Sequence, residues 1–383
     1  MKSQKNFVFI ISFAHLVQDT YASFLAPILP LLIEKLDMSL MMSAFLEIAR
    51  KLASLFNPFF GLLIQRSDAR YFVILSPTLT AISMSLLGIA NSYALIVFLL
   101  IIAGISSTLF HIPSPTIIKA SSQNTIGRGM SYYMGGGELA RTIGPLIITG
   151  AISLWGLHGT WRLIPFGMIA SLILYYKLKD FQLTHTNFVK KREKGDALQE
   201  VKNFLPLFIK IAGFLFFQSA MKMAVTLYLV VYLTQKGFSL WDATIALSVL
   251  QFFGVIGTFI SGNISDKIGR QKTLLFMSSG SALIMSSFLF ISTFYSTLFI
   301  LALLGIFMFA NAPILLSIIH ELDTKMPTFI NSIYMSINFS INSLILFIIG
   351  GFGDHLGLEF TYKIAAILAF ISIPFAGKLY HKG

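Results

Sequence analysis

Residues 7–33 read FVFIISFAHLVQDTYASFLAPILPLLI, a mainly apolar run that is long enough to cross a bilayer as a helix. Similar runs recur along the 383-residue chain, which is 56% hydrophobic and only 11% charged. Soluble domains carry about 25% charged residues. A backbone in lipid satisfies its own hydrogen bonds as a helix or a closed barrel. Because these runs exceed the roughly ten residues of a barrel strand and do not alternate in polarity, the sequence predicts an all-α polytopic membrane protein.

We expect twelve membrane-spanning helices in two sets of six. The predicted spans are residues 7–33, 40–65, 71–90, 94–118, 130–153, 160–178, 204–234, 240–264, 273–292, 295–320, 328–352 and 359–377. The predicted domains are an N-terminal six-helix bundle (1–178), a hydrophilic cytoplasmic linker (179–203) and a C-terminal six-helix bundle (204–383). The first run is longer than the apolar region of a secretory signal and contains charged groups, so we do not expect it to be cleaved.

The basic residues predict an orientation. The net charge of +12 could indicate nucleic-acid binding, but most Lys and Arg residues fall in short loops on one side of the predicted membrane. The loops on the other side hold only Lys35, Arg162, Lys236 and Lys363. Basic loops remain in the cytoplasm. We therefore expect a multi-pass protein of the cell (inner) membrane with both termini in the cytoplasm, and no nucleic-acid partner.

The two halves of the chain share local patterns at the same spacing. GISSTLFHIP (104–113) in the fourth span matches GIFMFANAP (305–313) in the tenth. Glycine-rich turns follow the fifth span at Gly156 and the eleventh at Gly357. Repeated halves that hold a site near the bilayer midplane are typical of secondary transporters.

The stretch GNISDKIGRQK (262–272) resembles the loop motif G-x-x-x-D-x-x-G-R-[RK] of the major facilitator superfamily. The resemblance implies a twelve-helix fold of two pseudo-symmetric bundles, alternating access and a monomeric state. It implies a cytoplasmic gating latch made by Gly262, Asp266, Gly269, Arg270 and Lys272. We expect the glycine at position 262 to allow close helix packing and the aspartate to face a neighbouring helix N-terminus.

The corresponding loop of the first half has lost most of this motif. Gly61 is present, but Gln65 replaces the aspartate, and Asp68 and Arg70 are displaced. Either the latch works mainly in the second half, or Arg66 and Asp68 form a substitute for it.

The fifth span contains GGGELARTIGP (135–145), which resembles the G-x(8)-G-P motif of drug:proton antiporters in this superfamily. The resemblance favours export and assigns Gly144 and Pro145 to bending and tight helix packing.

Two stretches, AHLVQDTYASFLAPILPLL (14–32) and GISSTLFHIPS (104–114), resemble the fosmidomycin-resistance group of facilitators. His15 and Asp19 match its first-span H-x3-D pattern. Phe110 and His111 match the start of its fourth-span F-H-P pattern, which an inserted isoleucine interrupts.

Ionisable residues in the predicted spans are expected to face the bundle interior or a wet cavity, since exposure to lipid is costly. His15 and Asp19 lie one helical turn apart on one face. Histidine changes charge in the physiological range, as proton coupling requires. We expect this pair to carry or sense the coupling proton; the alternative is a fixed hydrogen-bonded pair that joins helices. His111 could bind substrate, assist Asp19 or only pack.

Two further spans carry charge pairs. In the fifth span, Glu138 and Arg141 could exchange partners between conformations, or the glutamate could be the proton site instead of the first-span aspartate. In the second span, we expect Glu47 to neutralise Lys51, with Arg50 available to a substrate.

The slight excess of basic over acidic groups in the spans favours an anionic or zwitterionic substrate. Lys222 in the seventh span has no acidic residue within one helical turn. The predicted substrate-binding residues are Arg50, His111, Arg141, Gln218, Lys222 and Asn311. For an uncharged amide among them, an interhelical hydrogen bond is the alternative role.

The sequence favours a proton-coupled exporter of a small organic solute, of the drug-efflux kind. The alternative is a proton-coupled symporter that imports a small metabolite. An intramembrane enzyme is disfavoured, because no H-E-x-x-H, G-x-S-x-G or nucleotide-binding motif occurs in the sequence. The chain has no cysteine, which excludes thiolate metal sites, and we expect no metal or cofactor.

Overall fold

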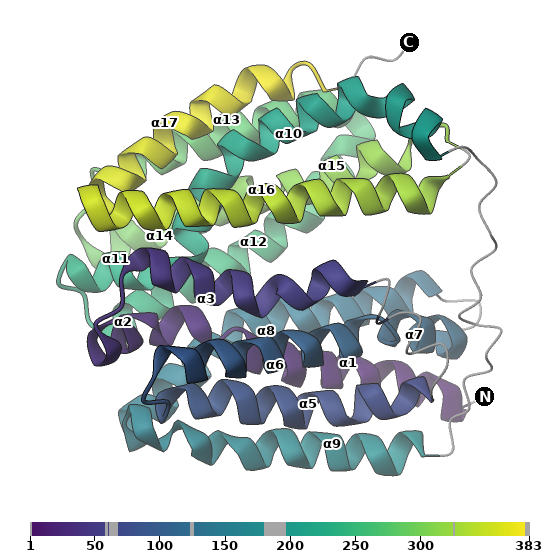
Figure 1. Ribbon diagram of the computed structural model, residues 1–383. Coiled ribbons are helices and arrows are strands. Elements are labelled where there is room, and N and C mark those ends of the chain that lie inside the picture. Colours follow the sequence, from purple (N-terminus) through teal and green to yellow (C-terminus); the bar gives the residue numbers. More distant parts are fainter. Residues whose placement is uncertain are drawn as a thin grey trace. The chain divides into compact units, whose positions relative to one another are not determined.

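The computed structural model describes residues 2–57, 60, 68–122, 126–179, 197–324 and 326–379. Every regular element in these residues is a helix (Figure 1). Nine segments among them are long and apolar enough to cross a membrane: Phe7–Leu36, Arg70–Gly88, Tyr93–His111, Leu157–Leu178, Leu198–Leu227, Leu240–Ile268, Phe294–His320, Phe329–Leu356 and Leu358–Ala376. The prediction of an all-α membrane protein is confirmed.

Within the described residues, the other three predicted spans do not form helices that are both long enough and apolar enough to be counted with these nine. The second span, 40–65, runs partly outside those residues. The fifth, 130–153, lies in a long helix that carries Glu138, Arg141 and several glycines, and the ninth, 273–292, is rich in serine. The count of twelve stays a prediction.

The chain divides into two compact units. The first comprises Met1–Met38 and Phe45–Lys190. Its helices are α1 (Lys2–Ala22), α2 (Leu25–Leu36), α3 (Leu40–Leu52, from Phe45 onward), η1 (Ala53–Phe56), α5 (Ala69–Ser85), η2 (Leu86–Gly88), α6 (Tyr93–His111), α7 (Ser114–Ser122), α8 (Ile126–Trp155), η4 (Leu157–Leu163) and α9 (Ile164–Leu178).

The second unit comprises Ser39–Ala44 and Lys191–Gly383. Its helices are α10 (Ala197–Leu227), α11 (Leu229–Gln235), α12 (Leu240–Ile268), α13 (Arg270–Phe288), α14 (Phe294–Phe309), α15 (Asn311–His320), α16 (Pro327–Leu356) and α17 (Leu358–Ala376). The helix of the seventh span begins at Ala197 and not at residue 204, because the polar residues before the apolar run continue the same helix.

Several predicted spans are interrupted helices. The first breaks between α1 and α2, where Pro27 lacks the N–H that would bond the carbonyl of Ser23 four residues earlier. The fourth breaks between α6 and α7, just before Pro113, and the tenth breaks between α14 and α15, before Pro313. The backbone is therefore irregular within these predicted spans, as it is at the binding sites of many transporters.

The two predicted glycine turns end equivalent helices. Gly156 follows α8 with φ +71°, and Gly357 follows α16 with φ +79°. Glycine adopts this left-handed conformation without the steric cost that a Cβ brings. These turns confirm one element of the internal similarity between the halves.

α1 is the central helix of the first unit and packs against α5, α6, α7, α8 and α9 (Figure 1). A chain of buried polar contacts joins three of these helices. The side-chain amide of Gln18 donates to the hydroxyl of Thr80 at 2.6 Å, and Thr80 donates to Ser106 at 2.8 Å. Ser106 in turn donates to the carbonyl of Ser76 at 2.9 Å. This chain fixes the rotation of α1, and so the direction in which its ionisable face points.

Candidate functional site

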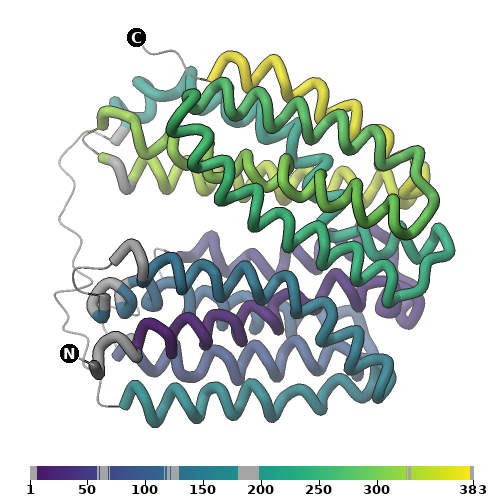
Figure 2. The backbone as a smooth tube through the Cα atoms, turned by 180° about the vertical axis from the view of Figure 1, so that it is seen from behind, coloured from purple at the N-terminus to yellow at the C-terminus, as the bar shows by residue number. Residues whose placement is uncertain are grey.

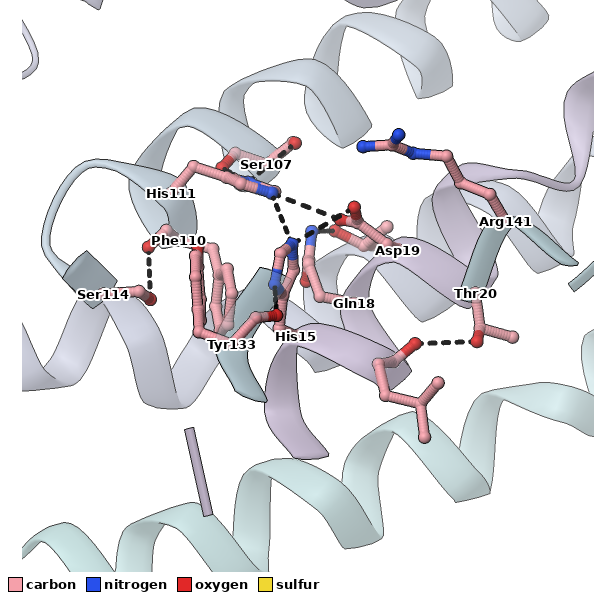
Figure 3. Close-up of polar contacts among 12 residues, drawn as sticks. His15, Gln18, Asp19, Thr20, Ser107, Phe110, His111, Ser114, Tyr133 and Arg141 are labelled. Carbon is pink, nitrogen blue, oxygen red and sulfur yellow. Dashed lines mark hydrogen bonds and ion pairs between the residues drawn. The ribbon is translucent and has the colours of Figure 1, made fainter. Parts of the chain in front are cut away.

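His15, Asp19 and His111 meet in the first unit, although 96 residues separate the two histidines (Figure 3). His15 and Asp19 lie one turn apart on α1, and His111 is the last residue of α6, next to the helix break before Pro113. Asp19 Oδ2 lies 3.3 Å from His15 Nε2, and Asp19 Oδ1 lies 3.3 Å from His111 Nε2. The two Nε2 atoms lie 3.1 Å apart. We call these three residues the His–Asp–His cluster.

Both rings are oriented by backbone carbonyls. His15 Nδ1 lies 2.7 Å from the carbonyl oxygen of Tyr133, and His111 Nδ1 lies 2.7 Å from that of Ser107. A carbonyl oxygen can only accept, so each Nδ1 carries a hydrogen and donates it. A neutral imidazole has one hydrogen on its nitrogens. In its neutral form, each ring therefore presents a bare Nε2 to the other ring and to the carboxylate.

With both rings neutral and the carboxyl group ionised, this geometry leaves the centre of the cluster without a hydrogen-bond donor. Two bare nitrogens at 3.1 Å, each 3.3 Å from a carboxylate oxygen, would be three acceptors with no donor between them. One added proton, on an imidazole or on the carboxyl group, would supply a donor. His15 and Asp19 are only 3% and 7% exposed, whereas the side chain of His111 is 37% exposed. His111 is therefore the member of the cluster whose ring is open to its surroundings.

The same donor atoms could hold a metal ion. The ligand atoms of His15, Asp19 and His111 lie within 4.8 Å of one another. Carbonyl bonds that orient the far nitrogen of an imidazole are also common around metals. The direct Nε2–Nε2 contact, however, is already at hydrogen-bond distance.

The wall behind His15 is formed by α8 and α6. The ring of Tyr133 stacks on the imidazole of His15 at 4.1 Å between centroids, and Phe110 lies at 5.8 Å. A Cβ added at Gly137 would lie 2.5 Å from Cε1 of the same imidazole. Glycine at this position leaves room for the imidazole, and at the neighbouring Gly136 a Cβ would meet the carbonyl of Ser12 on α1.

The fifth-span pair lies beside the cluster. Arg141 NH1 donates to both oxygens of Glu138, at 2.9 and 3.0 Å, so the two form a local pair on α8. In Figure 3 the guanidinium of Arg141 extends toward the side on which Asp19 and His111 meet. It is close enough for its charge to act on His111. The side chain of Arg141 is 44% exposed, so its outer face is open to an anion.

The second-span charges form a tighter group. Arg50 donates to both oxygens of Glu47, at 2.8 and 2.7 Å, and Lys51 Nζ lies 2.8 Å from the same carboxylate. The predicted pairing of Glu47 with Lys51 is confirmed, but Arg50 shares it. The charges of Arg50 and Asp19 interact.

The second unit contains a polar pocket with about 460 Å³ of empty volume, part of it open to solvent. Lys222, Asn311 and Gln218 all line it, together with Asn338 and Asn342. Asn311 is only 4% exposed, and both of its amide atoms lack a partner among the described residues. Lys222 Nζ lies 5.5 Å from the centre of the Phe309 ring. Unused amide donors and acceptors beside an ammonium group suit a polar, anionic ligand.

Gln218 differs from Asn311 in the same pocket because both atoms of its amide group already form hydrogen bonds. Its nitrogen donates to Ser281 at 3.1 Å, and its oxygen accepts from Ser372 at 2.8 Å. These bonds join α10 to α13 and α17. This is the interhelical role that the sequence left open as the alternative.

The loop motif ties three helix ends of the second unit together. Arg270, at the start of α13, pairs with Asp266 at the end of α12 and with Glu321 at the end of α15, at 2.8 Å. The hydrogen bond that Arg270 donates to Glu321 is the main cause that raises the pKa of the Arg270 guanidinium. Gly269 between α12 and α13 has φ +94°, which favours glycine. Lys272 is exposed.

One packing prediction for this motif is wrong. No atom of the described residues lies within 4 Å of a Cβ built at Gly262, so no close helix contact forms there. The close approach occurs at Gly257, where a Cβ would meet the carbonyl of Ile306 on α14. Asp266 pairs with Arg270, the first residue of α13, and its expected position facing a neighbouring helix N-terminus stays a prediction.

The other motif predictions have mixed outcomes. At Gly144 a Cβ would meet Ser23 Oγ, which confirms tight packing, and α8 continues through Pro145 without interruption. Gly61, Gln65 and Arg66 of the eroded motif lie outside the described residues. Asp68 caps α5 and pairs with Arg70 at 2.7 Å.

Sequence reasoning missed Tyr133 and Ser107. Both act through main-chain carbonyls, which leave no signal in the residue type. The three consecutive glycines at 135–137 were the nearest available sign that α8 approaches another helix closely.

Paired helical units with ionisable groups at helix interruptions define the class of secondary transporters. The Major Facilitator Superfamily profile matches residues 11–345, and the chain belongs to this family. It is a multi-pass membrane transporter of a small molecule and not an enzyme.

The chain is 25% identical to the Fosmidomycin resistance protein of Escherichia coli K12, over 95% of this chain and 90% of that one. In fold it resembles an inward-facing bacterial homologue of the human lysosomal transporter Spinster, with a TM-score of 0.80, 13% identity and coverage of 98% and 97%. It also resembles a D-xylose–proton symporter, with a TM-score of 0.74, 13% identity and coverage of 98% of each chain.

Proposed function

We propose that this chain is a proton-coupled exporter of a small organic anion or zwitterion, and that the His–Asp–His cluster carries the coupling proton. The observation that carries the proposal is the contact between two Nε2 atoms and one carboxylate when both Nδ1 hydrogens are committed to carbonyls. A shared proton satisfies this arrangement, and its loss leaves mutual repulsion. Protonation and deprotonation therefore give the cluster two different preferred geometries, which is what coupling needs.

The similarity to a resistance protein supports export as the direction of transport. A resistance protein protects a cell when it removes a compound, and the similarity to the Fosmidomycin resistance protein extends over nearly the whole chain. The G-x(8)-G-P pattern that ends at Gly144 and Pro145 supports the same direction. A drug-like phosphonate or a carboxylate metabolite such as a siderophore has the expected charge.

The substrate anion is proposed to bind the cationic groups that face open space. In the first unit this is Arg141, with its outer face exposed and His111 nearby. Arg50 is a weaker candidate, because its side chain is only 19% exposed and already pairs with Glu47. In the second unit Lys222 supplies the charge, and Asn311 supplies unused amide hydrogen bonds. An anion at Arg141 would compete with Glu138, and through His111 with Asp19, so substrate and proton would exclude each other as antiport requires.

We assign alternating access to two bundles, residues 1–178 and 204–383, joined by the linker 179–203. The ties that Arg270 makes to Asp266 and Glu321 are proposed to hold the cytoplasmic end of the second bundle and to rearrange during transport. We propose a monomer in the cell membrane with both termini in the cytoplasm.

The test is efflux from proteoliposomes of purified protein under an imposed pH gradient. Candidate solutes are first selected by comparing the tolerance of cells that lack the protein with that of cells that overproduce it. A gradient that drives protons against the solute should accelerate wild-type efflux, and Asp19→Asn should abolish this acceleration. Asp242→Asn is the matched control, since Asp242 is half-buried at the start of α12, and its hydrogen bonds among the described residues are with its cap residue Ser239.

Three outcomes would contradict the proposal. Proton-dependent flux that is unchanged in Asp19→Asn would remove the cluster from coupling. Acceleration only when protons and solute move in the same direction would establish the importing symporter instead. Loss of transport on treatment with a metal chelator, restored by a divalent metal, would assign the cluster to a metal ion and not to a proton.

A further inference from the structure

A large apolar groove lies on the first unit, on a face of α1 other than the one that carries the cluster. It has about 1020 Å³ of empty volume between α1, α8 and α9, part of it open to the outside. The side chains that shape it include Phe13, Phe24, Ile147, Phe166, Ile169 and Ile173. Its two polar members are internally satisfied, since Thr20 donates to the carbonyl of Leu16 and Tyr21 to that of Leu163. The groove therefore offers an apolar surface with no unused hydrogen-bonding group from these two residues.

The groove opens outward on this unit. Phe166, Ile169 and Phe13 are 61%, 53% and 50% exposed. Figure 2 shows α1 running beside α8, with α9 along the edge of the same unit, and α1 packs against both. Exposed apolar side chains of a membrane-spanning unit face lipid, so this hollow is open to the acyl chains of the bilayer.

One end of the groove carries a cation and two indole rings. Arg162 lies in η4, four residues before Phe166, so it stands at the head of the α9 stripe that lines the groove. Its guanidinium lies 5.7 Å from the ring centres of both Trp155 and Trp161. Arg162 is exposed, and no carboxylate in the described ranges is within ion-pair distance of it. Tryptophan and arginine at the end of a span mark the headgroup level of the bilayer.

The length of the groove matches one leaflet. Along α9 it extends from Leu163 to Ile173, about 15 Å at 1.5 Å per residue. This is half of a hydrocarbon core roughly 30 Å thick. The apolar part of the groove begins next to Arg162. A molecule that fills the groove therefore has a charged group at the headgroup level and an apolar chain about as long as one leaflet.

We propose that this groove is a binding site for one anionic phospholipid, with an acyl chain between α1, α8 and α9 and the headgroup phosphate on Arg162. The site lies apart from the cluster and does not depend on the proposed substrate or on proton coupling.

The three tryptophans of the chain provide a direct test, because two of them stand at the proposed headgroup end. The Trp241→Phe variant leaves Trp155 and Trp161 as the reporters. It is reconstituted into phosphatidylcholine vesicles that contain a minor fraction of phosphatidylglycerol brominated near the glycerol end of its chains, since bromine quenches indole fluorescence. We expect several-fold more quenching than with the same fraction of brominated phosphatidylcholine. Adding Arg162→Gln should remove the difference, and Arg162→Lys should keep it.

A pair of double variants tests the groove. Ile169→Phe with Ile173→Phe fills it, whereas Met168→Phe with Leu172→Phe places the same ring at the same spacing on exposed positions outside it. Only the first should lose the phosphatidylglycerol quenching, with both variants eluting as single folded species. Equal quenching by the two lipids, an unaltered Arg162→Gln variant, or equal behaviour of the double variants would each overturn the proposal.

Discussion

His15 and His111 each use Nδ1 to bond a main-chain carbonyl, and this choice decides the chemistry of the cluster. The spacing of His15 and Asp19 on one helix face was predictable, because neighbours one turn apart depend only on helix geometry. The contact of His111 with both was not, since it depends on how α6 packs against α1. The sequence placed His111 among the substrate-binding candidates and left open that it assists Asp19, the arrangement that the geometry favours.

Gly137 provides a test of ring orientation. In Gly137→Ala the new methyl would lie 2.5 Å from His15 Cε1 and would push the imidazole from the Tyr133 carbonyl. We expect a loss of stability of about 1–3 kcal/mol, as for other overpacked sites, and loss of gradient-driven transport. Gly135→Ala is the control, because nothing lies within 4 Å of its added Cβ. Thermal unfolding and proteoliposome flux measure both; equal behaviour of the two variants would refute the explanation.

Transport kinetics can distinguish the roles of Asp19 and Glu138. Asp19 is buried between two imidazoles, whereas Glu138 pairs with a half-exposed arginine on its own helix. We expect Asp19→Asn to remove the effect of a pH gradient on efflux. Glu138→Gln should instead change the solute concentration at half-maximal rate, because it frees Arg141. The measurement is flux as a function of solute concentration, with and without a pH gradient. If Glu138→Gln removed the gradient effect and Asp19→Asn only changed the half-maximal concentration, Glu138 would be the proton site.

At the scale of the helices, proline and glycine positions decide where the ionisable groups stand. The apolar runs predicted continuous spans, but α6 and α14 end just before Pro113 and Pro313. The missing N–H and the steric clash of proline break the helix about one turn earlier. His111 and Asn311 therefore lie at helix interruptions, where some of the adjacent backbone N–H and C=O groups do not form regular helical hydrogen bonds.

Gly357 tests the turn that ends α16. Its φ of +79° is costly for a residue with a Cβ, so we expect Gly357→Ala to lower the free energy of unfolding by about 1–2 kcal/mol. Gly351, inside the same helix, has nothing within 4 Å of an added Cβ. Gly351→Ala should be neutral or stabilising by up to about 1 kcal/mol, since alanine favours helix. Unfolding in denaturing detergent would reveal the contrast, and a loss in both variants would contradict it.

At the scale of the whole chain, loop charge and internal repetition organise the protein. The basic bias across the loops and the family motif in residues 262–272 were both readable without coordinates, because each is a property of local sequence. The packing near that motif could not be predicted from the sequence. The close helix contact lies at Gly257 and not at Gly262, because its position depends on where α14 crosses α12.

The absence of cysteine makes the orientation directly testable. Single cysteines at Lys267 and Lys363 occupy exposed positions near opposite ends of helices in the second unit. In intact cells we expect a membrane-impermeant maleimide to label Lys363→Cys and to label Lys267→Cys only after permeabilisation. The cysteine-free parent is the blank. The opposite labelling pattern would invert the proposed topology.

By itself, the sequence determined that this protein is a helical membrane transporter of the major facilitator kind, with an ionisable pair in its first span. These conclusions come from hydropathy, loop charge, one-turn spacing and a loop motif. All four are local properties of the sequence, so they can be recognised without coordinates. Only the tertiary structure decided that His111 completes the cluster, that Tyr133 and Ser107 orient its rings, and that Gln218 joins helices. Those outcomes depend on how distant helices pack and on backbone carbonyls that every residue type shares.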